Sequence, residues 1–231
     1  TLSRMCEYSP YAYSDEIRRG FITIEGGFRV GIAGTAVECK DGISTIKYIN
    51  SLNIRISREL TGCADKVMKY VYGNTLIISP PGCGKTTILR DIIRQISNQG
   101  INISVVDERC EISGMYLGNI QFDLGICTDV LCCYSKSIGM NMMLRSMGPK
   151  IIAVDEIGSD EDILAIHNLL NSGVKIIATI HCDTIENILQ KPFIENIVKE
   201  KIFDSYIILN NNKKTGDLYK IYDKELNIVW Q

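Results

Sequence analysis

The sequence predicts an α/β protein: a mainly parallel sheet with helices on both faces and antiparallel edge strands, preceded by a small strand-rich module. Short, wholly apolar segments alternate with helical patterns in the later part of the chain. A glycine-containing loop joins one of these segments to a helix, and the first part shows mainly strand patterns. We expect an N-terminal module over residues 1–60, truncated upstream because the chain begins at Thr1, and a second domain over residues 61–231.

Each expected element follows from the spacing of its apolar residues. In the N-terminal module, where a Gly26-Gly27 turn is expected, the strands are Phe21–Ile24, Phe28–Ile32, Ile46–Ile49 and Leu52–Ile56. The expected helices of the second domain are Cys63–Tyr72, Thr87–Ser97, Ile138–Met147 and Asp160–Asn171, the last with a Ser159/Asp162 start signal. Its expected strands begin at Thr75 and continue with Ile101–Val106, Ile151–Val154, Val174–Ile180, Ser205–Leu209, Leu218–Tyr222 and Ile228–Trp230.

The composition argues against several classes of protein. The chain has 231 residues and 45% apolar content, enough to bury a sizeable core. Its net charge is −2, and neither part carries a marked basic excess: residues 1–60 have eight Lys/Arg against seven Asp/Glu and the remainder seventeen against twenty, which argues weakly against nucleic acid as the main partner. Nine cysteines and only two histidines favour reduced thiols over a disulfide framework or a zinc site. No signal peptide is evident, and no apolar run approaches the roughly 18 residues that a membrane span needs.

The segment from Thr75 to Thr87 has the composition of a phosphate-binding loop between a strand and a helix. Glycines let backbone N–H groups close around phosphate oxygens, a lysine adds a point charge, and a hydroxyl ligates Mg²⁺. Only Ser79 departs from the consensus glycine. A chance glycine-rich turn is the alternative, but the flanking strand and helix argue against it. The expected nucleotide-binding residues are Ser79, Pro80, Pro81, Gly82, Cys83, Gly84, Lys85, Thr86 and Thr87, with Thr86 also on the metal.

Two pairs of carboxylates follow expected strands. Ligands of open α/β sheets lie at the carboxyl ends of the strands, so these acids are expected to face the phosphate loop. We assign Asp155 to Mg²⁺ and Glu156 to activation of the attacking water, while two such acids can also simply cap the next element. Asp107 and Glu108 are rivals for the metal and water roles, or else form a solvated loop start.

One histidine is a further candidate. His181 follows an apolar strand, where its imidazole is placed to sense the γ-phosphate by hydrogen bonding; a structural role is the alternative. His167 is flanked by apolar residues on a helix and is interpreted as structural.

Several arginines are also candidates, because a guanidinium spreads positive charge over a phosphoryl group. Arg145 precedes the strand that carries Asp155 and is either catalytic or an ordinary surface charge. Arg29, Arg55 and Arg58 either reach a nucleotide, in their own chain or across a subunit boundary, or lie on a solvated face.

These motifs carry a resemblance to known ATPases. The Leu144–Ile157 and Ile177–His181 segments resemble the Walker B and histidine boxes of type II and type IV secretion and pilus-retraction ATPases, and Val106–Glu111 looks like their aspartate box. Those ATPases have Gly where Asp155 stands, so a second acid here puts the handling of the metal in question.

A closer resemblance covers nearly the whole chain. The segments Arg19–Thr23, Arg29–Gly34, Ser51–Glu59 and Ile78–Thr87 are similar to the stage III sporulation protein AA family, mother-cell ATPases of endospore-forming bacteria. In that family a serine opens the phosphate loop. The resemblance implies a RecA-like P-loop ATPase core, a homohexameric ring and a cytoplasmic place against the mother-cell membrane. It also implies membrane-embedded channel proteins as partners and the task of energising a channel to the forespore.

The sequence therefore predicts a motor subunit that hydrolyses ATP with Mg²⁺ and has no nucleic-acid partner. Two alternatives stay open. One is a RecA-like translocase on nucleic acid, which single-stranded DNA or RNA would stimulate. The other is a nucleotide-gated scaffold that assembles a channel without sustained hydrolysis.

Overall fold

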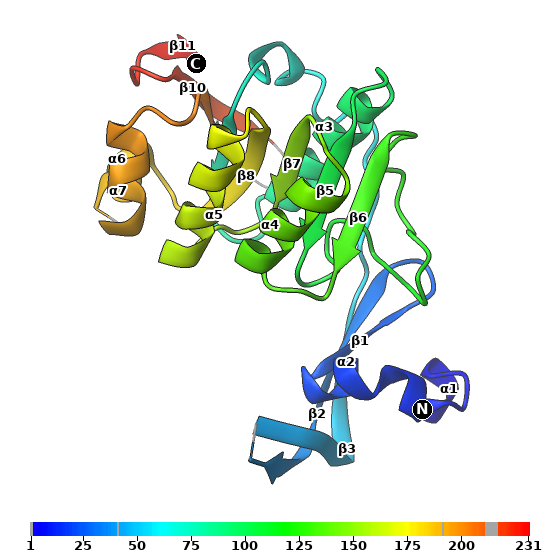
Figure 1. The fold of residues 1–231 in the computed structure, drawn as a ribbon. Coiled ribbons are helices and arrows are strands. Elements are labelled where there is room, and N and C mark those ends of the chain that lie inside the picture. Colours follow the sequence, from blue (N-terminus) through cyan, green and yellow to red (C-terminus); the bar gives the residue numbers. More distant parts are fainter. Residues whose placement is uncertain (1, 41, 191, 211–216) are drawn as a thin grey trace. The chain divides into compact units, whose positions relative to one another are not determined.

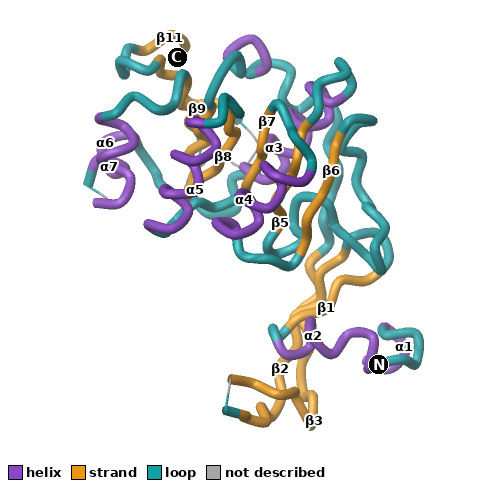
Figure 2. Tube along the Cα trace, viewed as in Figure 1, coloured by secondary structure: helices purple, strands orange, loops and turns teal. Residues whose placement is uncertain are grey.

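The computed structural model describes residues 2–40, 42–190, 192–210 and 217–231. The chain divides into two compact units: Thr1–Arg58 with Ser113–Phe122, and Glu59–Ile112 with Asp123–Gln231. Residues 113–122 belong to the long loop that Figure 2 draws between the fifth and sixth strands. Their packing with the first unit is a feature that the apolar spacing of the sequence does not indicate.

The first unit contains a three-stranded antiparallel sheet in the order β1-β2-β3. Gly26 and Gly27 have φ values of +81° and +71°, which favour glycine, and form the predicted turn between β1 and β2. Tyr13, Ile17 and Ile22 pack with residues of β2 in a small hydrophobic core. The elements are α1 (Leu2–Met5), a 3₁₀ helix (Pro10–Tyr13), α2 (Ser14–Arg18), β1 (Phe21–Ile24), β2 (Phe28–Cys39) and β3 (Gly42–Arg55).

The two strands expected at Ile46–Ile49 and Leu52–Ile56 are in fact one strand, β3. It pairs with β2 from Gly42 to Arg55, and register shifts between Ala33 and Thr35 and between Val37 and Glu38 keep the pairing continuous. The polar residues between the two apolar segments do not break the strand, because much of this ribbon is exposed.

The second unit is built on an eight-stranded sheet in the order β11-β10-β9-β4-β8-β7-β5-β6. The strands from β9 to β6 are parallel to one another, and β10 and β11 are antiparallel at one edge, as predicted. The strands are β4 (Thr75–Ser79), β5 (Ile103–Asp107), β6 (Thr128–Cys132), β7 (Ile151–Val154), β8 (Lys175–His181), β9 (Ser205–Leu209), β10 (Leu218–Asp223) and β11 (Ile228–Trp230). The predicted turn residues within 211–216 lie outside the described residues.

Helices cover both faces of this sheet (Figure 1). Successive residues of β4 point to opposite faces of the sheet and so pack in two different cores. Leu76 and Ile78 pack in the core with α4, α5, α6 and α7, whereas Ile77 packs in the core with α3. The central strands are therefore buried on both faces, which explains why their sequences are predominantly apolar. The helices are α3 (Lys85–Ser97), α4 (Lys136–Ser146), α5 (Asp160–Asn171), α6 (Ile185–Leu189) and α7 (Pro192–Lys199).

The helix predicted over Cys63–Tyr72 is wrong. This segment forms successive turns and a short 3₁₀ helix, Met68–Tyr70. Ala64 and Val67 are buried against α3, and the backbone N–H of Ala64 donates to Asp91 Oδ2 at 2.8 Å. The segment is thus held by tertiary contacts with α3, which override the helical spacing of its apolar residues.

Asp91 of α3 anchors the Cys63–Tyr72 segment through its hydrogen bond with the N–H of Ala64. The substitution Asp91→Asn is expected to lower the free energy of unfolding by about 2 kcal/mol at neutral pH. Burial raises the pKa of this carboxyl, but hydrogen bonds from Ala64, Arg94, Gly62 and Gln95 outweigh it and hold the pKa below 3.8. A lowered pKa stabilises the folded chain above the unfolded value, and this contribution is lost as pH falls through the folded value.

Urea unfolding of the wild type and Asp91→Asn at pH 7 and at pH 3 to 4 measures this effect. The difference between the two proteins should be largest at pH 7 and shrink on acidification. The matched control is Asp15→Asn, since Asp15 is 85% exposed in its pair with Arg18 and should contribute under about 0.5 kcal/mol. An equal loss in both variants would contradict the anchoring role of Asp91.

Within the described residues, no helix is long and apolar enough to cross a membrane.

Candidate functional site

The order of the strands brings the predicted site residues together. The strands β4, β8, β7 and β5 are consecutive and parallel, so their carboxyl ends share one edge of the sheet. Ser79 at the end of β4 is the register partner of His181 at the end of β8. Asp155 directly follows β7, and Asp107 ends β5. The phosphate loop, both acidic pairs and the histidine therefore meet at this edge.

The phosphate loop leads from β4 into α3. Gly82 and Gly84 have φ values of +77° and +89°, and a side chain at either position would be strained. Gly84 is the N-cap of α3, and its carbonyl accepts from the N–H of Ile88 at 2.9 Å. The positive end of α3 therefore begins at Lys85. Ser79 uses its hydroxyl within the loop, donating to the carbonyl of Pro80 at 2.9 Å.

Lys85 and Glu156 form the centre of the site. Lys85 Nζ lies 2.7 Å from Glu156 Oε1 and 2.9 Å from His181 Nε2, and His181 Nε2 is 2.6 Å from the same carboxylate oxygen. Arg109 Nη1 lies 2.9 Å from Glu156 Oε2. Burial raises the pKa of Glu156, but the hydrogen bond and charge of Lys85, with the charges of His181 and Arg109, hold the pKa below its usual value. Glu156 is therefore a carboxylate at neutral pH.

Asp155 and Thr86 form a second pair of oxygen donors. Thr86 Oγ1 donates to Asp155 Oδ2 at 2.6 Å, and the other carboxylate oxygen accepts from the hydroxyl of Thr179. A threonine hydroxyl beside a carboxylate, at the start of a phosphate-loop helix, is a donor set that suits a hard cation such as Mg²⁺. The chemistry of these two side chains thus fits the predicted metal role.

The backbone of Glu156 is held in an uncommon conformation. Its φ is +57°, in the left-handed region, which costs free energy for a residue other than glycine. Its N–H donates to Thr179 Oγ1 at 2.9 Å, and the next N–H, of Ile157, donates to the carbonyl of Thr179 at 2.9 Å. These two bonds to one residue of β8 fix the direction in which the Glu156 side chain leaves the backbone.

The alternative role of these acids, capping the following helix, belongs to other residues. Ser159 and Asp162 form the capping box at the start of α5: the Ser159 hydroxyl accepts from the N–H of Asp162 at 3.2 Å. The predicted start of this helix is confirmed, and Asp155 and Glu156 point into the cluster described above.

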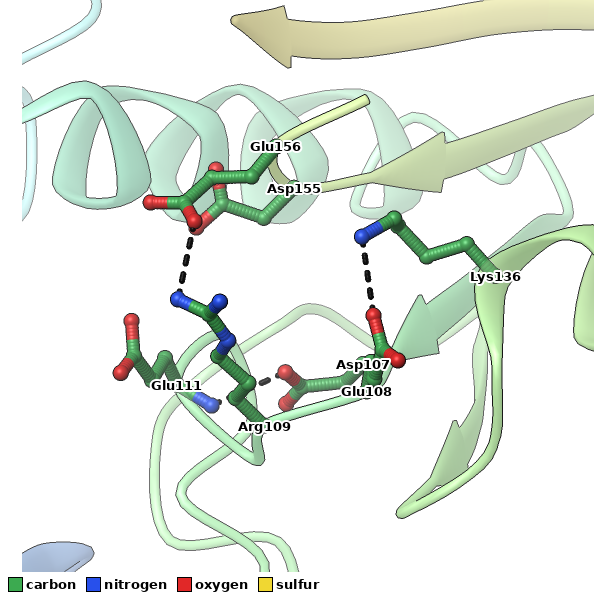
Figure 3. A pocket seen from close by; sticks show the side chains of 7 residues that line it. All are labelled: Asp107, Glu108, Arg109, Glu111, Lys136, Asp155 and Glu156. Carbon is green, nitrogen blue, oxygen red and sulfur yellow. Dashed lines mark hydrogen bonds and ion pairs between the residues drawn. The ribbon is translucent and has the colours of Figure 1, made fainter. Parts of the chain in front are cut away.

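The second acidic pair has other partners in this structure. The Asp107 carboxylate is buried and accepts from the backbone N–H groups of Glu111 and Ile112 at 2.9 and 3.1 Å. Glu108 Oε2 lies 2.8 Å from Lys136 Nζ. Figure 3 shows Asp107, Glu108, Glu111 and Lys136 lining the same pocket as Asp155, Glu156 and Arg109. Asp107 thus shapes the loop after β5, and Glu108 lies near the site in an ion pair.

The remaining arginine candidates lie on other elements of the chain. Arg145 is exposed in the last turn of α4, which leads toward the start of β7 and not toward its carboxyl end. Arg29, Arg55 and Arg58 belong to the first unit, where Arg29 lies 3.7 Å above the ring of Phe21 and pairs in register with Arg55. Their roles toward phosphate stay predictions.

The other residues named from the sequence have the following positions and neighbours. Cys83 is buried in the loop with its thiol 3.7 Å from the carbonyl of Pro81, and Thr87 lies in the first turn of α3. His167 lies on α5 with its Nε2 3.5 Å from Glu200, away from the phosphate loop.

Sequence reasoning missed two residues of the cluster, Thr179 and Arg109. Thr179 looks like one more buried strand residue, and only the register of β7 against β8 places its hydroxyl beside Asp155 and Glu156. Arg109 directly follows the acidic pair Asp107-Glu108 and lies within the Val106–Glu111 segment that resembles an aspartate box, and these two signals could have drawn attention to it.

Replacing Thr179 with Val is expected to lower the rate of any reaction at this site by about 10- to 100-fold while costing roughly 1 to 3 kcal/mol of stability. Valine keeps the shape of the side chain but leaves Asp155 and the Glu156 N–H without their shared hydroxyl. Turnover and thermal unfolding of Thr179→Val and Thr179→Ser measure this. Serine keeps the hydroxyl and should restore most of the rate; equal rates in the two variants would contradict the role of the hydroxyl.

Comparison with known proteins assigns this chain to a protein family. A model of the family described as Sporulation stage III, protein AA matches residues 1–229. Stage III sporulation protein AA of Bacillus subtilis (strain 168) is 40% identical over 238 residues, covering 99% of this chain and 77% of that protein. The resemblance drawn from the sequence is thereby confirmed.

Solved structures of secretion-type ATPases have the same fold. The ATPase DotB of Yersinia pseudotuberculosis gives a TM-score of 0.61 at 14% identity, over 96% of this chain and 66% of that one. The pilus retraction motor PilT, solved with bound ADP, gives 0.53 at 16% identity, over 78% of this chain and 54% of that one. At these identities the likeness shows the fold, and it confirms the predicted fold class. The chain belongs to the sporulation stage III, protein AA family and has the fold of the secretion and pilus-retraction ATPases.

Proposed function

We propose that this chain is an ATP-hydrolysing motor subunit whose chemistry lies in the domain over residues 61–231. The observation that carries the proposal is the convergence of Lys85, Thr86, Asp155, Glu156 and His181 at the ends of the neighbouring parallel strands β7 and β8 and at the start of α3. A buried ammonium at a helix N-terminus suits nucleotide phosphates, and an ionised carboxylate beside it suits activation of water. Phosphoryl transfer needs little more than such positioning and charge neutralisation.

Each side chain has a distinct role in this proposal. The backbone N–H groups of Gly82, Cys83 and Gly84 and the ammonium of Lys85 hold the phosphates, and Glu156 orients the attacking water and accepts its proton. His181, which contacts both Lys85 and Glu156, reports the state of the phosphates. Thr86 and Asp155 would hold Mg²⁺, which when bound supplies positive charge to the phosphate oxygens.

The finer parts of the proposal concern assembly. Membership in the family supports a role in sporulation. We propose that copies of this chain form a homohexameric ring in the mother-cell cytoplasm, against membrane-embedded channel proteins, and that hydrolysis energises a mother cell–forespore channel. Arg29, Arg55 or Arg58 of the N-terminal module would then complete the site, within one chain or between neighbours. No nucleic-acid partner is proposed.

Phosphate release from ATP, measured with and without Mg²⁺ over a range of protein concentrations, tests the proposal. We expect Mg²⁺-dependent release whose rate per chain rises steeply with concentration, because assembly completes the site. Tight ATP binding without sustained release at any concentration would favour the nucleotide-gated scaffold. Strong stimulation by single-stranded nucleic acid, lost at high salt, would favour the translocase.

A further inference from the structure

Glu156 is held between Lys85 on one carboxylate oxygen and Arg109 on the other, and His181 Nε2 lies 2.6 Å from the oxygen that Lys85 contacts. Lys85 Nζ lies 2.7 Å from Oε1, and Arg109 Nη1 lies 2.9 Å from Oε2. The lysine side chain is only 8% exposed, whereas the arginine side chain is 58% exposed. Figure 3 shows Arg109 reaching Glu156 from the loop after β5. The carboxylate thus has one buried and one exposed counter-charge.

The buried counter-charge has a competing task. Under the proposed function, the Lys85 ammonium neutralises nucleotide phosphates, and its contacts here are to Glu156 Oε1 and His181 Nε2. Phosphate oxygens compete with Glu156 for this one ammonium. When Lys85 turns to the phosphates, Glu156 faces a like charge at close range, and Arg109 is the cation that stays on its other oxygen.

The backbone that carries Arg109 is fixed from two sides. The Asp107 carboxylate accepts from the N–H groups of Glu111 and Ile112 at 2.9 and 3.1 Å. The buried guanidinium of Arg90 donates to the carbonyls of the same two residues, both at 2.8 Å. The loop is therefore anchored to α3, the helix that also carries Lys85.

The acid next to Arg109 does not draw it away from Glu156. Glu108 pairs with Lys136 at 2.8 Å, so the two cations of this pocket are divided between two acids. The backbone of Glu156 is itself fixed by Thr179. Since the backbone is fixed, the position of the carboxylate depends on the side-chain torsions of Glu156. Arg109 restrains these torsions by holding Oε2, the oxygen that Lys85 does not contact.

We propose that Arg109 is a positioning residue for hydrolysis, holding Glu156 Oε2 in place while Lys85 exchanges Oε1 for a nucleotide phosphate. The inference rests on the proposed function. Without the guanidinium, the phosphates repel the Glu156 carboxylate and turn it from the attacking water. Nucleotide binding, which comes from Lys85 and the loop amides, is unaffected. The loss therefore falls on turnover and not on affinity.

The test compares Arg109→Ala and Arg109→Lys with Arg18→Ala, a matched control from an exposed ion pair in which the arginine side chain is 53% exposed. We expect Arg109→Ala to lower kcat by about 10- to 100-fold, with the dissociation constant for ATP unchanged within about threefold. Lysine keeps the charge but not the fork of donors, so Arg109→Lys should recover part of the rate. Arg18→Ala should match the wild type.

A double-mutant cycle separates positioning from a general structural effect. In the Glu156→Gln background, Arg109→Ala should cause no further loss, since its target carboxylate is already absent. Wild-type turnover in Arg109→Ala, an equal loss in both backgrounds, or a rise in the ATP dissociation constant as large as the fall in kcat would overturn the inference alone. A wild type that releases no phosphate would overturn the proposed function and this inference with it.

Discussion

Glu156→Gln is expected to lower the turnover of ATP by about 10³-fold while leaving ATP binding nearly intact. The amide keeps the size of the side chain and one acceptor oxygen but has no charge with which to accept a proton from water. The expected loss is in the chemical step and not in ATP binding, because it is the ionised carboxylate that accepts the proton. Lys85, His181 and Arg109 keep Glu156 ionised by holding its pKa below the usual value. The neutral amide also competes less with phosphate for Lys85, so affinity should be kept or rise.

Phosphate release under saturating ATP, with binding measured separately, checks this result. The matched control is Glu195→Gln, since Glu195 pairs with Lys199 on the surface of α7 and should leave both quantities at their wild-type values. A Glu156→Gln variant that keeps wild-type turnover would remove Glu156 from the water-activating role and leave Glu108 as its rival.

The second large effect is expected from Lys85→Ala, which should weaken ATP binding by about 100-fold or more. A buried, charge-assisted contact contributes roughly 1.5 to 3 kcal/mol, and each 1.4 kcal/mol is a factor of ten in affinity. The Lys85 ammonium contacts more than one phosphate oxygen in a loop of this type, so the total exceeds that of a single bond. The variant also leaves Glu156 facing the phosphates without its buried counter-charge.

Titration with a fluorescent ATP analogue measures the loss directly. Lys199→Ala serves as control, because it removes a lysine that is 64% exposed and pairs with Glu195 far along the chain from the loop. ATP should raise the unfolding temperature of the wild type and of Lys199→Ala but not of Lys85→Ala. Equal ATP affinity in all three proteins would contradict the phosphate role of Lys85.

Much of the second unit could be predicted because local patterns there agree with the tertiary fold. Strand β4, the phosphate loop and α3 are specified by adjacent residues, and the Ser159/Asp162 pair starts α5 where expected. The edge strand β6 was missed because Thr128–Cys132 is half polar and only partly buried, so its sequence shows neither clear alternation nor an apolar run. Helices α6 and α7 were missed as well.

The helix predicted over Cys63–Tyr72 failed for the opposite reason: its apolar spacing was helical, but burial of Ala64 and Val67 against α3 and the bond to Asp91 favoured turns. In the first unit, the length of β3 depends on pairing along β2 and not on its own apolar residues.

In the candidate site, too, some residues could be predicted from local sequence patterns, and others depend on tertiary structure. Lys85, Thr86, Asp155, Glu156 and His181 could be named from the sequence because each lies at a strand end or a helix start, and parallel strands align these ends. Thr179 and Arg109 could not be assigned, because their contacts depend on the register of β8 and on the path of the loop after β5.

The central claim is that the cluster around Lys85 and Glu156 cleaves ATP, and a comparison of Glu156→Gln with Glu108→Gln tests it most directly. Single-turnover cleavage of bound, radiolabelled ATP is the measurement, made with Mg²⁺ at a protein concentration that saturates assembly. The account predicts cleavage by the wild type, bound but uncleaved ATP in Glu156→Gln, and at least tenfold faster cleavage in Glu108→Gln than in Glu156→Gln. Cleavage lost in Glu108→Gln and kept in Glu156→Gln, or absent from the wild type, would contradict it.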